Sequence, residues 1–272
     1  HDGWLYIAET DAVGRIRFDV TTGAVQGEFE RILEGLPGGG NHWSRTLRMG
    51  PDGKFYVSIG SSCNVCIEKD PRRAAILRFD PDGHNPEIFA TGLRNSVGFD
   101  WHPTTGALWF TNNGRDMLGD ETPPDTLHHA PRAGMHFGFP FCHQGNIQDP
   151  EFNTRPCSDF RSPAQRLGPH VASLGMEFYT GDMFPASYRD QIFIAEHGSW
   201  NRSPEAGHTG YRLMVARLDG DRVTEYDIFA EGWLEATNEA WGRPVDVEVM
   251  PDGALLVSDD SVGAIYRITY SN

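Results

Sequence analysis

Trp4-Leu5-Tyr6-Ile7-Ala8-Glu9 is the first of five copies of one short pattern, and this repetition decides the fold. Each copy has bulky apolar residues followed by a small one, and in four of the five an acidic or amide residue comes next. The other copies are Lys54–Ile59, Ala107–Asn112, Gln191–Glu196 and Ala254–Asp259. A strand repeated along a chain indicates one supersecondary unit repeated around an axis. We therefore predict an all-β fold, a β-propeller, with residues 1–272 as a single domain.

The segments around these copies complete the blades. Turns with the sequence Pro-Asp-Gly precede two of the copies, and this sequence favours a tight turn. A second and a third strand, the third more polar, are expected after most copies. These strands are predicted at 14–19, 75–80, 211–216 and 264–269, then at 28–33, 86–90 and 225–230. The segment from about Asn113 to Leu167 is rich in Pro, Gly and Asp, and we expect it to be a long irregular loop.

The two ends of the chain lack strands that complete blades would have. No apolar strand precedes the first copy, and the last blade shows three strands. About five blades are therefore visible, and we expect an N-terminal part to be missing.

Composition narrows the class of protein. The chain has 23 Lys and Arg against 38 Asp and Glu, a formal net charge of −15, which argues against nucleic acid or an anionic membrane as a partner. No apolar run is long enough to span a membrane. Cys63 and Cys66 are close in sequence, as are Cys142 and Cys157. We interpret them as two local disulfides of an exported protein, with free thiols of a cytoplasmic protein as the alternative.

Basic residues recur just before the repeats. His42, Arg94 and Arg243 stand at similar distances upstream of the repeated strands, and His170 lies in a polar cluster upstream of another, so we expect a propeller to bring all four to one mouth of its channel. Such a group suits a polyanionic cofactor or substrate, because guanidinium groups bind carboxylates. An acidic loop of Asp116, Asp120, Glu121 and Asp125 has oxygen ligands for Ca²⁺ but no EF-hand spacing, so a solvated loop is an equal alternative.

Several motifs resemble those of the soluble sugar dehydrogenases that depend on pyrroloquinoline quinone (PQQ), nearest to the L-sorbosone and aldose dehydrogenase-like branch. The resemblance runs through nearly the whole chain. The motifs are Gly39–Arg45, Gly50–Lys54, Ser61–Asn64, Gly92–Asn95, Asn113–Asp120, His197–Arg202 and Gly242–Pro244. The resemblance implies a six-bladed propeller with PQQ at the channel mouth and a Ca²⁺ that polarises the quinone.

The resemblance also implies roles for single residues. His42 matches the general base, which takes a proton from a sugar hydroxyl or aldehyde hydrate as hydride passes to PQQ. Arg94, the second residue that we assign to catalysis, matches a position beside the quinone oxygens, as does Asn95. Histidine suits the base because its ordinary pKa lies near working pH.

Further positions match the cofactor and metal sites of the family. Arg243 matches an arginine that pairs with a cofactor carboxylate. His197, Trp200 and Arg202 fall in the segment that lines the other side of the cofactor. The backbone carbonyls of Gly114 and Arg115 match those that hold Ca²⁺. No role is implied for His170.

The expected function is therefore oxidation of a sugar or sugar aldehyde in the periplasm or outside the cell. No haem-attachment motif is present, since Cys66 is followed by Ile67, so a separate electron acceptor is expected. Two alternatives stay open: a metal-dependent propeller hydrolase of the lactonase type, and a non-catalytic binding propeller. The first needs Glu, Asn and Asp side chains around one channel metal, whereas the residues above are His and Arg.

Overall fold

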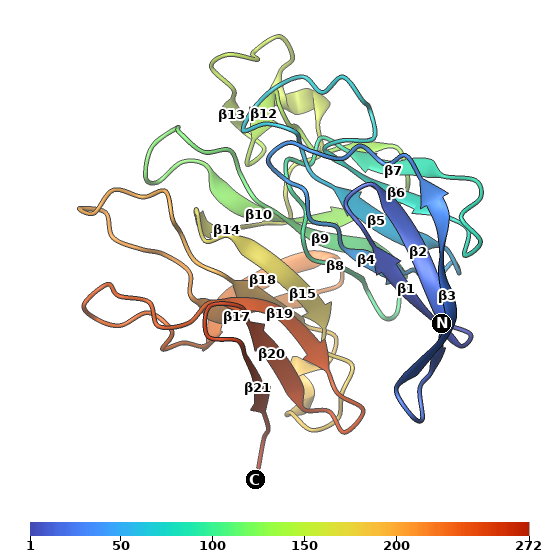
Figure 1. The fold of residues 1–272 in the computed structure, drawn as a ribbon. Coiled ribbons are helices and arrows are strands. Elements are labelled where there is room, and N and C mark those ends of the chain that lie inside the picture. Colours follow the sequence, from blue (N-terminus) through green and yellow to red (C-terminus); the bar gives the residue numbers. More distant parts are fainter. Residues whose placement is uncertain (272) are drawn as a thin grey trace.

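The computed structural model describes residues 1–271 as an all-β propeller of five blades (Figure 1). Every copy of the repeated pattern forms a strand, so the predicted fold class is confirmed. These repeated strands are β1 (Trp4–Ala8), β5 (Phe55–Ile59), β9 (Leu108–Asn112), β16 (Ile192–Glu196) and β20 (Leu255–Asp259).

The remaining strands build antiparallel sheets around the repeated ones, with a single parallel pairing, of β11 with β7. The first and last blades have three strands each. The first three sheets add β2 (Ala12–Asp19) and β3 (Ala24–Glu34); β4 (Leu47–Met49), β6 (Ala75–Phe79), β7 (Glu87–Thr91) and β11 (Met135–His136); and β8 (Phe99–Trp101), β10 (Pro124–Ala130) and β14 (Gln165–Pro169). The last two add β15 (Ser173–Phe178), β17 (Arg212–Asp219) and β18 (Arg222–Ala230); and β19 (Pro244–Val249) and β21 (Ala264–Ile268).

The hydrophobic core lies between neighbouring blades. Successive side chains of a strand point to opposite faces, so a strand between two blades serves two cores. In β5, Phe55 and Val57 pack toward the first blade, whereas Tyr56 packs toward the third. In β16, Ile194 packs toward the third blade and Phe193 packs toward the fifth. This double burial explains why the repeated strands are continuously apolar.

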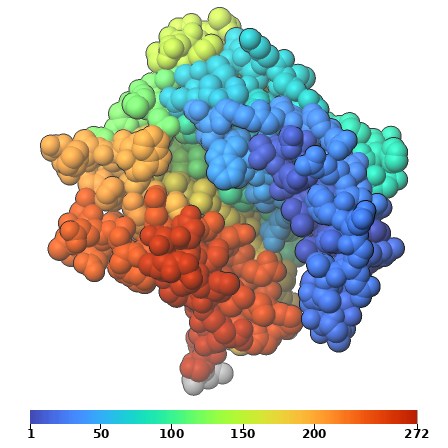
Figure 2. Space-filling model, in the orientation of Figure 1, coloured from blue at the N-terminus to red at the C-terminus, as the bar shows by residue number. Residues whose placement is uncertain are grey.

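The two terminal blades each leave one sheet face uncovered. In β1, Tyr6 packs against the second blade, whereas Leu5 and Ile7 on the opposite face are 39% and 41% exposed. In β21, Ile265 is 72% exposed. No apolar cluster among residues 1–271 joins β1–β3 to β19–β21, and Figure 2 shows a notch between the N-terminal and C-terminal blades.

The prediction of an irregular loop from Asn113 to Leu167 was wrong in part. The segment contains β10, the third strand of the middle blade, and it also holds β11, β12 (Cys142–His143), β13 (Ile147–Gln148) and a 3-10 turn, η1 (Cys157–Asp159). A second such turn, η2, spans Ala186–Tyr188. The sequence of β10 looks polar, but His128 and His129 are buried and stack on Phe110 and Trp109. Burial lowers the pKa of His128 to about 3, so this ring stays neutral and packs as an aromatic.

Both predicted disulfides are present, Cys63–Cys66 and Cys142–Cys157. Cys63, Cys66 and Glu68 form the only cluster of three metal-ligating side chains in the described part of the chain, but the disulfide removes the two thiolates. No helix within residues 1–271 has the length and apolar character needed to cross a bilayer.

Gly98 sets the approach of the third and fourth blades. A Cβ at this position would lie 2.2 Å from the carbonyl oxygen of Leu174 and 2.6 Å from the amide nitrogen of Met176, both on β15. We expect Gly98→Ala to lower the free energy of unfolding by about 1–3 kcal/mol, because backbone atoms cannot rotate out of the way. Denaturant unfolding measures this, with Gly38→Ala as the control, since a Cβ there meets its nearest atom at 3.5 Å. Equal stability of the two variants would contradict the argument.

Candidate functional site

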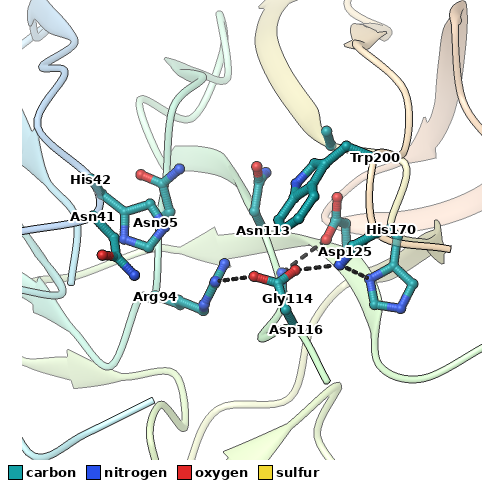
Figure 3. A pocket seen from close by; sticks show the side chains of 12 residues that line it. Asn41, His42, Arg94, Asn95, Asn113, Gly114, Asp116, Asp125, His170 and Trp200 are labelled. Carbon is teal, nitrogen blue, oxygen red and sulfur yellow. Dashed lines mark hydrogen bonds and ion pairs between the residues drawn. The ribbon is translucent and has the colours of Figure 1, made fainter. Parts of the chain in front are cut away.

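One cavity of about 410 Å³ opens where loops from successive blades meet (Figure 3). Its volume lies in the range typical of small-molecule sites. The loops after β3, β7, β9, β14 and β16, together with the start of β10, supply its lining. The lining residues are Asn41, His42, Arg94, Asn95, Asn113, Gly114, Asp116, Asp125, His170, Ala172, Trp200 and Asn201.

His42 is held with one ring nitrogen engaged and the other free. Its Nδ1 lies 2.8 Å from the Ser61 carbonyl oxygen and 3.0 Å from Ser61 Oγ. A carbonyl oxygen only accepts, so Nδ1 carries the proton and Nε2 carries the lone pair. Burial, followed by the charge of Arg94, lowers the pKa of His42 to about 4. The ring is therefore neutral at pH 7, with Nε2 available as a proton acceptor.

Arg94 is buried, and neighbouring groups hold its guanidinium. Its Nη2 donates to Asp116 Oδ2 at 2.8 Å and to Asn64 Oδ1 at 2.9 Å, while its Nε donates to the Asn64 carbonyl at 2.9 Å. Its Nη1 has no hydrogen-bond partner among residues 1–271. Arg94 thus presents one free amino group in a cavity that His42 also lines.

The segment after β9 combines free carbonyls with a buried carboxylate. Asp125 is 3% exposed, and it accepts the amide of Gly114 at 2.8 Å and that of Ser173 at 3.0 Å. Burial raises the pKa of Asp125 to about 6, although the hydrogen bonds from these two amides lower it. The carbonyl oxygens of Gly114 and Arg115 accept no hydrogen bond from the described residues. Oxygen donors beside carboxylates are what a hard cation such as Ca²⁺ requires.

His170 and Trp200 complete the far side of the cavity. His170 Nε2 donates to the Gly119 carbonyl at 2.8 Å, and its Nδ1 accepts from the amide of Asn201 at 3.2 Å. Asn201 also donates to Asp116, which links His170 to the Arg94 pair. Trp200 is 67% exposed at the rim, so an indole face is free to cover a flat ligand.

Four of the residues matched to catalytic, cofactor or metal positions of the family do not line this cavity. Arg243 donates to the carbonyls of His197 at 3.2 Å and Gly198 at 2.7 Å, behind the segment that carries Trp200. His197 itself contacts Asp260 at 2.9 Å. The Arg115 side chain is buried against Asp149, which leaves only its backbone as a candidate ligand.

Arg202 is the fourth of these residues. Its guanidinium donates to Glu121 and to the carbonyls of Asp120, Ala206 and Gly207. Arg202 therefore ties two loops together, and its donors face protein groups rather than the cavity.

The cavity holds acidic as well as basic side chains. Arg94 pairs with Asp116, and Asp125 lines the same cavity, so carboxylates offset the charge of Arg94. Asn41, Asn113 and Asn201 also line the cavity; they fall within the motifs quoted above, but none was assigned a role from the sequence. Their positions in the sequence could have identified them, because Asn41 adjoins His42, Asn201 adjoins Trp200, and Asn113 follows a repeated strand. These amide and carboxylate groups are of the kind that the hydrolase alternative needs around its metal, so that alternative stays open at this point.

The fold and this cavity define a propeller with a candidate ligand site where its interblade loops meet. Residues 6–267 match the sequence profile of the glucose/sorbosone dehydrogenase family, and the chain belongs to that family.

A protein of Borreliella burgdorferi named only as uncharacterized is 40% identical over 221 residues, which cover 80% of this chain and 57% of that one. The chain spans about half the length of these curated relatives, a second of which is an uncharacterized protein of Synechocystis.

Two solved structures share the fold. One is the holo form of the PQQ domain of pyranose dehydrogenase from Coprinopsis cinerea, with a TM-score of 0.78 and 22% identity over 98% of this chain and 79% of that one. The other is the calcium structure of a Trichoderma reesei carbohydrate-active enzyme, with a TM-score of 0.81 and 19% identity over 97% and 77%.

Proposed function

We propose that this protein oxidises a sugar or sugar aldehyde with PQQ as the hydride acceptor and Ca²⁺ as the metal. The observation that carries the proposal is His42, a neutral imidazole with a free Nε2 in a cavity that Arg94 also lines. Family membership and the names of the two structural neighbours support the same chemistry.

The residues of the cavity fit both groups. The free carbonyl of Gly114 lies in the cavity lining with Asp116 and Asp125, and the free carbonyl of Arg115 follows it in the chain, so these oxygens form a set suited to Ca²⁺. A bound cation would offset these two carboxylates, so a carboxylated cofactor then meets Arg94 and a metal rather than net negative charge. Trp200 would cover one face of the flat ring, and Asn95 lines the same cavity on the side of His42 (Figure 3). We propose indirect roles for Arg243, His197 and Arg202, which shape the loop that carries Trp200.

When bound, PQQ supplies the two-electron acceptor that no side chain provides. The chain's own part is to bind, orient and move a proton. His42 Nε2 takes the proton of the reacting hydroxyl, and the Nδ1–H bond to Ser61 keeps the ring in the required tautomer. Arg94, whose Nη1 has no hydrogen-bond partner among residues 1–271, would donate a hydrogen bond to negative charge that develops on the bound acceptor. Trp200 at the rim limits the access of water.

Reconstitution tests the proposal. We expect the purified protein to reduce a dye with an aldose only when PQQ and Ca²⁺ are both added. The reason is that a Ca²⁺ held by the carbonyls of Gly114 and Arg115 would orient the cofactor. Removing Ca²⁺ with a chelator should abolish dye reduction, and added Ca²⁺ should restore it.

Two results would reject this function. Dye reduction that is independent of PQQ would exclude the proposed cofactor. Hydrolysis of a lactone by the metal-loaded protein without PQQ would establish the hydrolase alternative instead. The control is the same assay with heat-denatured protein, since free PQQ itself reacts with dyes.

We also propose that the protein works in the periplasm or outside the cell and passes its electrons to a separate acceptor. Two disulfides support an oxidising compartment.

A further inference from the structure

The loop Ser61–Glu68, which we call the clasp loop, lies directly against residues that line the cavity. The Ser61 amide donates to the Arg94 carbonyl at 2.7 Å, and the Ser61 carbonyl accepts from His42. The next carbonyl, of Ser62, accepts the amide of Asn41 at 3.1 Å. Three lining residues from two different interblade loops thus depend on one short segment.

Asn64 connects this loop to Arg94 and Asp116 by four hydrogen bonds. Its Oδ1 accepts from Arg94 Nη2 at 2.9 Å and from the Asp116 amide at 2.8 Å. Its Nδ2 donates to the Asp116 carbonyl at 3.1 Å, and its own carbonyl accepts from Arg94 Nε at 2.9 Å. One asparagine therefore holds both partners of the Arg94–Asp116 ion pair, although Asn64 itself does not line the cavity.

The Cys63–Cys66 disulfide closes the loop on either side of Asn64. Glu68 stabilises the same loop, because its carboxylate accepts hydrogen bonds from the Ser62 amide at 2.6 Å and from the Ser62 hydroxyl at 2.8 Å. A covalent closure over so few residues restricts the conformations open to Asn64. The restriction favours the orientation in which its side chain meets Arg94 and Asp116.

We infer that Asn64, held by the Cys63–Cys66 disulfide, is a positioning residue that fixes Arg94 and Asp116 in the cavity and thereby sets the electrostatic surroundings of His42. For its catalytic meaning the inference rests on the proposed function. The positioning itself is a property of the chain alone.

The test is the titration of His42 in the protein without cofactor, followed by NMR of labelled histidine. Arg94 and Arg73 lower the pKa of His42, and Asp116 raises it. In Asn64→Ala the guanidinium of Arg94 loses its held position, so we expect the pKa of His42 to rise by about one unit. Cys63→Ser/Cys66→Ser, and reduction of the wild type by a dithiol, should shift it in the same direction.

Matched controls separate positioning from general loosening. Gln148→Ala removes a side-chain hydrogen bond to the Arg155 carbonyl at an exposed site. Cys142→Ser/Cys157→Ser removes the other disulfide. Neither control should move the His42 titration.

An unchanged His42 titration in folded Asn64→Ala and in the cysteine pair variant would overturn the inference. If Asn64→Ala does not fold, the cysteine variant and the reduced wild type decide. The titration needs neither PQQ nor Ca²⁺, so a wild type that oxidises no sugar would reject the proposed function and leave this result standing.

Discussion

Replacing His42 by alanine is expected to lower kcat for sugar oxidation by a factor of about 10²–10⁴. The reason is the position of its free Nε2, which has no hydrogen-bond partner among residues 1–271 and belongs to a ring that lines the cavity. The affinity for PQQ should change little, because no charge is removed: the lowered pKa keeps this imidazole neutral. Steady-state kinetics, together with PQQ titration by tryptophan fluorescence, measure the two effects separately.

His84→Ala is the matched control for this experiment, since the His84 side chain is 77% exposed and is not among the residues that line the cavity. It should leave kcat unchanged. Turnover in His42→Ala equal to that of the wild type would reject the assignment of the base. Loss of PQQ binding in the same variant would show instead that His42 acts in binding.

The fold was predictable because the burial of the repeated strands is visible in the sequence as continuous apolar residues. A strand between two blades must be apolar on both faces, and β5 and β16 are fully buried in this way. The same logic failed for β10, whose His128 and His129 are polar by type but pack as neutral aromatics on Phe110 and Trp109. A pattern of residue types does not reveal which histidines are neutral.

The site was predictable in position but not in pairing. His42, Arg94 and His170 stand at equivalent places before inner strands, and they line one cavity. Arg243 stands at a fourth such place, but its guanidinium is committed to the carbonyls of His197 and Gly198.

Repeat spacing locates a backbone, whereas the partner of a long side chain depends on every group within its reach. The ion pair of Arg94 with Asp116, and the contacts of both with Asn64, join segments that no spacing rule connects. The functional roles assigned to these residues therefore stay predictions until the variants are measured.

A group of charged side chains around Arg48 lies in the central channel, and we expect a large loss of stability when it is disrupted. A cavity of about 180 Å³ there is lined by residues of β4, β8, β15 and β19 and includes Arg48. Arg48 lies 3.4 Å from Glu177 and 3.8 Å from both Asp100 and Glu248, and Asp246 lines the same cavity. Burial raises the pKa of Glu177 to about 8, and it also raises those of Asp100 and Asp246. A single cation therefore compensates several crowded carboxylates.

Removing that cation should destabilise the fold in a way that depends on pH. A carboxyl whose pKa is raised by folding binds more protons in the folded state, so its contribution to stability falls as pH rises from about 4.5 to about 8. Arg48→Met leaves the carboxylates uncompensated, and we expect it to lower the free energy of unfolding at pH 8 by about 3–5 kcal/mol. At pH 5 the loss should be much smaller, because the carboxyls then take up protons.

Denaturant unfolding at the two pH values measures this difference. Arg189→Met is the control, since the Arg189–Asp182 pair is exposed and should contribute less than about 1 kcal/mol at either pH. Glu177→Gln in the Arg48→Met background should recover part of the loss at pH 8, because it removes the carboxylate with the most strongly raised pKa. A loss in Arg48→Met that is equal at pH 5 and pH 8 would mean that Arg48 stabilises the channel by packing and not by charge.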